Sequence, residues 1–436
     1  FVFAQDLWRG EFLAAGIAHE FLIVGAPPNL DGQKLLDDAH RICAAQQQFW
    51  GAQPAIFERY VFMLHATEDG YGGLEHMAST ALICARTDLP QLGQGARSAG
   101  YISLLGLISH EYFHSWNIKR LRPAPLAQYD YSCESYTDLL WFFEGFTSYY
   151  DDFFLLRTGL IDAPQYLALL TKSIQALAGN PGAQVQSVAQ ASFDAWVKYY
   201  RPDENTINAT VSYYTKGALL ALCFDLTLRA EGQGNLDAVM RLLWRQQQGS
   251  IKAISEADIA AALAQVGQRS FTPELQAWVH GRADLPLPSL LQQHGLAWQT
   301  QVPTWAQRLG IKVQEGSSAR ASNLKIQAVL RASVAEAAGL AAGDEWLGVV
   351  VAGQSWRIYQ LEQLAYLLPP AAQDGQQAVG ILYSREQRIH QGQLQLQLQR
   401  QSSPAPLQAL CIADAALLQK WLRCPTNADP LPYTRC

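Results

Sequence analysis

Residues 108–117 read ISHEYFHSWN and place His110, Glu111 and His114 in an HExxH arrangement. On an α-helix, positions four apart lie one turn above each other, so both imidazoles can point at one metal ion while Glu111 projects beside them. The apolar run YISLLGLI before the motif predicts the buried part of such a helix. HExxH also occurs by chance, so the motif alone leaves two interpretations open, a zinc site or ordinary polar side chains.

A catalytic zinc ion takes three protein ligands and keeps a fourth position for water, so a third His, Asp or Glu is required. Glu144 is the strongest candidate, because it lies among aromatic residues in the segment DLLWFFEGFTSYYDD. A buried carboxylate is costly unless a metal or fixed hydrogen bonds compensate it. Glu134 is nearer to His114 in sequence, but its surroundings, QYDYSCESYTD, predict a solvated loop. We therefore expect one Zn²⁺ ion bound by His110, His114 and Glu144.

Several segments, in order, resemble those of one group of enzymes. HEYFHSWN, WFFEGFTSYYDD and YYTKGA look like the corresponding segments of the gluzincin metallopeptidases. GYGGLEHMAST at residues 70–80, FDAWVKYYRPDENT at residues 193–206 and a PDZ-like segment near the C-terminus extend the likeness. The chain most resembles the glycyl aminopeptidase family, with the aminopeptidase N family as a more distant relative, and the resemblance covers most of the chain.

This resemblance implies an α+β fold with a thermolysin-like zinc peptidase domain, a helical region and a small β-rich PDZ domain. It implies that His110, His114 and Glu144 bind zinc. Glu111 would take a proton from the zinc-bound water and later deliver it to the leaving amine. The chemistry agrees, because zinc lowers the pKa of its water to about 7 and polarises the scissile carbonyl.

Tyr214 is the expected donor to the negatively charged carbonyl oxygen that forms during attack. It occupies the tyrosine position of the YxKG pattern of aminopeptidase N relatives, in which this residue stabilises the oxyanion. Such a donor contributes on the order of 3 kcal/mol to the rate. Tyr213 is the adjacent alternative. Without the resemblance, a half-buried tyrosine opening the apolar helix KGALLALCFDL is the simpler interpretation.

The segment GYGGLEHM combines flexible glycines with one carboxylate. Gly72 and Gly73 allow the backbone to approach a substrate closely, and Glu75 presents a negative charge that suits a free N-terminal amine. In aminopeptidase N relatives the corresponding Glu grips the substrate's α-ammonium group. His76 stands where those relatives have Asn, so this position departs from their pattern. The alternative is a tight turn with a solvated Glu75.

Two features next to the motif receive no catalytic role. Trp116 and Asn117 support the helix and the metal site in the relatives, but a core Trp and a helix-ending Asn are an equally good interpretation. The run KRLRP at residues 119–123 predicts a solvated helix end stopped by Pro123, with contact to a substrate carboxylate as the alternative.

Composition limits the partners. The 436 residues are 49% hydrophobic and 16% charged, which suggests about two to four domains. A net charge of -6 with a pI near 5.9 gives no electrostatic case for nucleic acid or anionic lipid. No apolar stretch approaches the ~18 residues of a membrane span, and FVFAQDLWRG lacks the pattern of a signal peptide. The compartment stays open between the cytoplasm and the periplasm of a bacterium.

The predicted secondary structure of the chain changes along its length. After about residue 300, short strands, the turn GLAAGDEW and a carboxylate-binding loop expected at Leu309, Gly310 and Ile311 resemble a PDZ domain, which binds a C-terminal peptide as an added strand. The predicted order is the end of a truncated N-terminal β domain and its linker (1–28), a thermolysin-like catalytic domain (29–235), a helical region (236–300), a PDZ-like domain (301–402) and a C-terminal tail (403–436).

The sequence therefore predicts a zinc aminopeptidase acting on peptides with a free N-terminus, and the resemblance implies a preference for Gly or Ala as the first residue. One alternative is an endopeptidase with the same metal site. The other is a peptide-binding protein in which the PDZ-like segment acts and the metal site is vestigial. The intact set of His110, Glu111, His114 and Glu144 argues against this last interpretation.

Overall fold

The computed structural model describes residues 7–51, 55–128, 130–247, 252–314, 324–373, 378–396 and 408–422. The chain forms two compact units. Unit 1 comprises the residues up to Leu170, Tyr213–Ala297 and the residues from Leu410 onward, and unit 2 comprises Thr171–Ser212 and Trp298–Ala409. Helices and several sheets are mixed along the chain, which confirms the expected combination of α and β structure.

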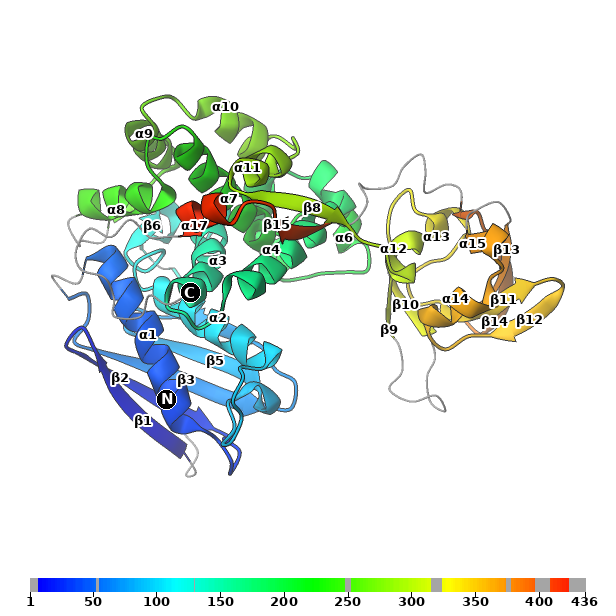
Figure 1. Cartoon of the computed structure of the whole chain (residues 1–436), viewed down its shortest axis with the longest axis horizontal. Coiled ribbons are helices and arrows are strands. Elements are labelled where there is room, and N and C mark those ends of the chain that lie inside the picture. The colour runs from blue at the N-terminus through cyan, green and yellow to red at the C-terminus, as the bar shows by residue number, and fades with distance from the viewer. Residues whose placement is uncertain are drawn as a thin grey trace. The chain divides into compact units, whose positions relative to one another are not determined.

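Within the described residues, unit 1 contains a five-stranded sheet in the order β1-β2-β3-β5-β4. Its strands are β1 (Leu7–Ala14), β2 (Ile17–Val24), β3 (Arg59–Thr67), β4 (Gly72–Glu75) and β5 (Ser79–Ala85). β2, β3 and β5 run parallel, whereas β1 and β4 are antiparallel to their neighbours. Helix α1 (Gly32–Trp50) connects β2 to β3 and lies across the sheet (Figure 1). β4 is therefore an edge strand.

The N-terminal strands belong to this sheet. We expected residues 1–28 to be the end of a separate β domain, but β2 pairs with β3 from Ala18–Arg59 to Val24–His65. The physical reason is visible in the sequence IAHEFLIV, whose residues are buried along most of the strand, as is usual for a strand inside a sheet. The other predicted domain bounds stay a prediction.

Three helices form the centre of unit 1: α2 (Ala99–Phe113), α3 (Leu140–Arg157) and α7 (Tyr213–Ala230). α2 begins after Ser98, whose hydroxyl accepts a hydrogen bond from the Tyr101 N–H at 3.1 Å. α3 and α7 cross at two glycines. A Cβ built on Gly145 would lie 2.6 Å from the carbonyl carbon of Gly217, so only glycine permits this approach.

Shorter or peripheral elements complete unit 1. They are η1 (Arg86–Asp88), β6 (Leu121–Pro123), η2 (Ala124–Leu126), α8 (Leu236–Gln247), β7 (Lys252–Ile254), α9 (Glu256–Gly267), α10 (Thr272–Glu274), η5 (Leu275–His280), α11 (Leu287–Gln293) and α17 (Ala415–Leu422). Strand β8 (Leu296–Thr300) pairs with β15 (Gln408–Ile412), and a boundary between the units falls within each of these strands. α17 buries Trp421 beside the rings of Phe153 and Tyr166, so this part of the expected C-terminal tail packs into unit 1.

Unit 2 contains, in its described residues, an antiparallel sheet in the order β14-β13-β11-β10-β9, with β12 paired to β11. Its strands are β9 (Ile311–Gln314), β10 (Leu324–Val329), β11 (Glu345–Val351), β12 (Gln354–Arg357), β13 (Val379–Arg385) and β14 (Arg388–Leu394). Its shorter elements are η3 (Pro181–Gln184), α5 (Val188–Phe193), η4 (Ala195–Tyr199), α6 (Thr206–Ala209), α12 (Trp305–Leu309), α13 (Val334–Ala337), η6 (Leu361–Gln363), α14 (Leu364–Leu367) and α15 (Pro370–Gln373). Helix α4 (Ala163–Ala178) contains the boundary between the units.

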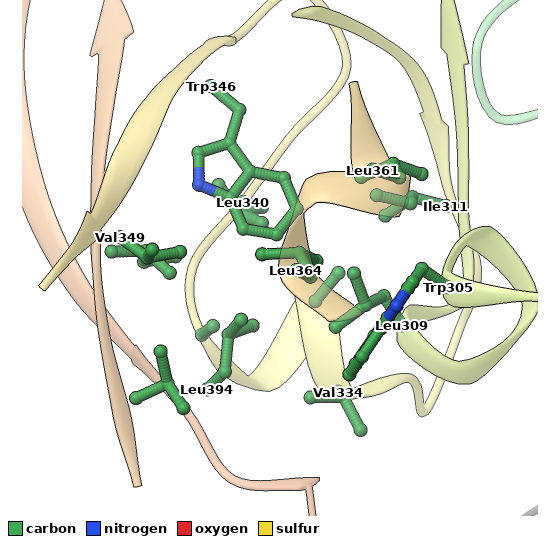
Figure 2. Close-up of a cluster of buried hydrophobic side chains, with 14 of the residues drawn as sticks. Trp305, Leu309, Ile311, Val334, Leu340, Trp346, Val349, Leu361, Leu364 and Leu394 are labelled. Atoms are coloured by element: carbon green, nitrogen blue, oxygen red, sulfur yellow. The ribbon is translucent and has the colours of Figure 1, made fainter. Parts of the chain in front are cut away.

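The core of unit 2 is apolar. Figure 2 shows Trp346, Val349 and Leu394 from the sheet facing Leu364 and Leu309 from the short helices. Leu309 and Ile311 both point into this core, and Gly310 between them has a φ of 69° that ends α12. The identification of this unit as a PDZ domain stays a prediction.

Candidate metal centre

Helix α2 and helix α3 bring three metal-binding side chains together. The His110 and His114 rings lie with centroids 4.6 Å apart and planes at 86°. Their Nε2 atoms are 3.3 Å and 3.2 Å from the Oε2 atom of Glu144. One donor atom from each residue lies within 4.8 Å of the other two, and His110 and His114 are buried. The sequence thus predicted correctly which three side chains meet, while their role as zinc ligands stays a prediction.

The second nitrogen of each imidazole is also bound. His110 Nδ1 is 3.0 Å from Asp151 Oδ2, and His114 Nδ1 donates to the Asn117 carbonyl at 2.9 Å. These contacts fix the ring orientations and favour a proton on Nδ1, which leaves both Nε2 lone pairs directed at the common point. Two imidazoles and one carboxylate are the ligand set of many catalytic zinc sites, so the residues present fit this ion.

The electrostatics of the site favour a cation. Burial alone would lower the pKa of His110, but the carboxylates of Asp151 and Glu144 raise it well above its ordinary value. Burial would raise the pKa of Glu144, but the two imidazoles hold it below its usual range. The cluster therefore stabilises positive charge, which is what a divalent ion supplies.

Glu111 is placed beside the ligands but is not one of them. Its side chain is buried, and among the described residues no hydrogen-bond partner is found for Oε2. Burial raises the pKa of Glu111 to about 7, against the opposing effect of the two imidazoles. A Cβ built on Gly73 of β4 would overlap the Glu111 carboxylate. The absence of a side chain at Gly73 therefore makes the room that Glu111 occupies.

Asp151 is a site residue for which the sequence analysis proposed no role. It lies on α3 seven positions after Glu144, which places the two carboxylates on one face of the helix two turns apart. That spacing was visible in EGFTSYYD and would have identified it. Glu134, the rejected alternative, is exposed and does not belong to the metal-binding group.

Tyr214 opens α7 near the metal ligands. Its ring centroid is 6.1 Å from that of His110, and the neighbouring Tyr213 is buried with its ring centroid 4.8 Å from that of Tyr214. The close crossing at Gly145 and Gly217 brings this end of α7 against α3, directly beside Glu144. The structure thus places Tyr214 near the site, and its predicted role is untested.

Glu75 ends the edge strand β4. Alternate residues of a strand share one face, so Glu75 and Gly73 both face α2 and Glu111. The Glu75 Oε1 atom lies 3.0 Å from Lys119 Nζ. His76 turns back to its own strand, with Nδ1 3.1 Å from the Leu74 carbonyl. Gly72 pairs with Ile83 of β5.

The basic run after the motif is not a solvated helix end, and that prediction was wrong. Arg120 and Arg122 are buried. Arg120 donates to the Ser115 carbonyl at 2.6 Å, and Arg122 donates to the Lys119 carbonyl at 2.9 Å. Burial lowers the pKa of Arg120 to about 10. The reason is a sharp turn at Ile118, whose φ of 100° folds the basic residues back against the protein.

Comparisons with known proteins agree with this geometry. The sequence profile of the M61 glycyl aminopeptidase family matches residues 103–220. An aminopeptidase N family protein from Idiomarina loihiensis has a similar structure, with a TM-score of 0.86 and 32% identity over 96% of this chain and 71% of that one. An M1 zinc metallopeptidase from Deinococcus radiodurans gives a TM-score of 0.42 and 17% identity over 65% of this chain and 54% of that one. No curated protein sequence matched the chain.

Proposed function

We propose that this chain, which belongs to the M61 glycyl aminopeptidase family, is a zinc-dependent aminopeptidase that removes the N-terminal residue from peptides. The observation that carries the proposal is the convergence of His110 Nε2, His114 Nε2 and Glu144 Oε2 beside the buried Glu111. When bound by these three residues, a zinc ion lowers the pKa of a water molecule and polarises the scissile carbonyl.

Glu111 is the proposed general base. Its Oε2 atom is buried without a hydrogen-bond partner among the described residues, and burial raises the pKa of its carboxyl to about 7. A carboxylate beside the metal ligands accepts a proton from the attacking water and returns it to the leaving amine. Gly73 supports this role, because it leaves the space in which the carboxylate lies.

Tyr214 is the proposed donor to the oxyanion. Its position at the start of α7, with its ring 6.1 Å from that of His110, supports a role close to the reacting carbonyl. A donor of this kind acts mainly in the transition state, so its loss lowers kcat more than it raises KM.

Glu75 is the proposed site for the substrate's free α-ammonium group, with Gly72 and Gly73 along the substrate backbone. Glu75 shares a strand face with Gly73 and so faces the Glu111 side of the site. This arrangement supports an aminopeptidase over an endopeptidase, since a charged group next to the metal ligands recognises a chain end. A preference for Gly or Ala as the first residue is part of this proposal.

Unit 2 is proposed to be a PDZ domain. Strand β9 lies at an edge of its sheet among the described strands, which is the position to which a C-terminal peptide would add as a further strand.

In the described residues no helix is both long and apolar enough to cross a membrane.

The test is the hydrolysis of trialanine and of its N-acetylated form by the zinc-loaded chain. The proposal expects the free-amine peptide to be cleaved at its first bond at least about 100-fold faster, since the acetyl group removes a charge-assisted contact of about 3 kcal/mol. Equal rates for the two peptides would favour an endopeptidase. No hydrolysis of either peptide would contradict the proposal.

A further inference from the structure

Glu75 already has a cationic partner in the protein. Lys119 Nζ lies 3.0 Å from Glu75 Oε1, and the side chains are only 13% and 17% exposed. Among the residues that the structure describes, Glu75 forms its ion pair with Lys119. An ionised carboxylate accepts hydrogen bonds at both oxygens, so this contact leaves Oε2 for a second donor.

A strained turn places Lys119 there. α2 ends at Phe113 and is followed by its C-cap His114, whose carbonyl accepts a hydrogen bond from the Lys119 N–H at 3.0 Å. Between them Ile118 has a φ of 100°, a conformation that a β-branched residue rarely adopts. The Ile118 N–H donates to the Leu121 carbonyl at 2.9 Å, which closes the turn. The backbone therefore fixes the direction in which the Lys119 side chain leaves the turn.

The same turn also holds one of the proposed metal ligands. The Asn117 carbonyl accepts from His114 Nδ1 at 2.9 Å. The Asn117 side-chain amide donates to the Phe143 carbonyl and to Thr147 Oγ1, both at 3.1 Å, and so ties the turn to α3. The segment 117–119 thus orients the His114 imidazole through Asn117 and contacts Glu75 through Lys119.

We propose that Lys119 is a positioning residue that sets Glu75 for recognition of the substrate's N-terminal amine. Lys119 holds the Oε1 atom of Glu75, so that the Oε2 atom is presented to the α-ammonium group. Because the Glu75 side chain is already held, it does not lose rotamer freedom when substrate binds. The inference rests on the proposed function, in which Glu75 binds that amine. Lys119 itself does not contact the reacting atoms.

The experiment uses the full chain loaded with zinc and four variants: Lys119→Met, which keeps the length of the side chain but not its charge, Lys119→Arg, which keeps the charge, Glu75→Gln, and the double variant that combines Glu75→Gln with Lys119→Met. Binding of alanine amide, measured by calorimetry, reports amine recognition without catalysis. KM and kcat for trialanine report the same step during turnover. Zinc content and thermal melting identify any variant that fails to fold.

Lys119→Met is expected to weaken alanine amide binding roughly tenfold and to raise KM by a similar factor, with a much smaller change in kcat. Lys119→Arg is expected to restore most of the affinity. In the Glu75→Gln background, Lys119→Met should change the affinity by less than about twofold, because the residue it positions is already altered. A Lys119→Met variant that binds alanine amide like the parent, or that loses as much affinity in the Glu75→Gln background, would overturn the proposal.

The outcome also separates this inference from the function on which it rests. If the parent chain cleaves acetylated and free trialanine equally and Glu75→Gln binds alanine amide like the parent, amine recognition by Glu75 fails and the Lys119 proposal fails with it. If the parent prefers the free amine and Glu75→Gln removes that preference while Lys119→Met does not, only the Lys119 proposal fails.

Discussion

The metal centre of unit 1 and the core of unit 2 are both well packed, but they bury different kinds of side chain. The metal centre buries His110, Glu111 and His114 next to the carboxylates of Glu144 and Asp151. The core of unit 2 consists of apolar residues such as those in Figure 2. Burying charge is costly, and proteins retain it where it serves chemistry. The comparison teaches that function can be inferred from unit 1, while the core of unit 2 requires no ligand to explain it.

The largest expected effect is loss of the metal. Glu144→Ala removes the one carboxylate among the three proposed ligands, so bound zinc should fall from one ion per chain to near zero and hydrolysis should disappear. Elemental analysis after dialysis measures this. Glu134→Ala is the matched control, because that carboxylate is exposed, and it should keep its zinc. Full zinc content in Glu144→Ala would show that Glu144 is not a ligand and would remove the distinction between the metal centre of unit 1 and the core of unit 2.

Glu111→Gln tests whether the Glu111 carboxylate acts in catalysis without binding the metal. The variant should retain one zinc ion, because Glu111 is beside the ligands and not among them, and kcat should fall by about 10³- to 10⁴-fold with the loss of the base. Steady-state kinetics and zinc analysis on the same sample measure both effects. Turnover near that of the parent would refute the assignment of Glu111.

Gly73→Ala tests whether Glu111 needs the space at β4. The added Cβ would overlap the Glu111 carboxylate, so kcat should fall by about 100-fold through misplacement of the base, with zinc retained. Gly95→Ala is the control, because a Cβ at Gly95 meets nothing within 4 Å. Equal activity of the two variants would show that the carboxylate moves aside freely.

Asp151→Asn probes the second contact of His110. The amide oxygen can still accept from Nδ1, which lies 3.0 Å from the carboxylate, but it carries no negative charge, so zinc affinity should fall by about 10- to 100-fold. Competition with a chelator of known affinity measures the change. An unchanged affinity would mean that the carboxylate serves packing alone, as polar residues do elsewhere in the fold.

Trp346→Ala changes the core of unit 2 and is expected to have the smallest effect on the metal centre. Trp346 is fully buried in unit 2, and its loss should destabilise that unit by about 3–5 kcal/mol. Zinc content should not change, because all three proposed ligands lie in unit 1. Urea denaturation followed with zinc analysis measures both quantities. A Trp346→Ala chain that binds no zinc would contradict the separation of the two regions.

The sequence predicted most of what lies on regular helices. The four-residue spacing of His110 and His114, and the lone carboxylate of Glu144 among aromatics, were sufficient to predict that the three would meet. The family resemblance is confirmed. Asp151 was equally visible two helical turns from Glu144, but the sequence analysis assigned it no role.

What the sequence did not reveal depends on contacts between distant segments or on unusual backbone. The positive φ of Ile118 could not be predicted, because a β-branched residue normally avoids it, and so the burial of Arg120 and Arg122 was missed. The pairing of β2 with β3 and the packing of Trp421 beside Phe153 join segments far apart in the chain. Local patterns carry no information on such partners.

Anomalous diffraction at the zinc edge from crystals of the zinc-loaded chain tests the central claim most directly. The account predicts one peak about 2 Å from His110 Nε2, His114 Nε2 and a Glu144 oxygen, with Glu111 next to it but not coordinating. A zinc ion held by other residues, or these three side chains lying too far apart to share one ion, would contradict it.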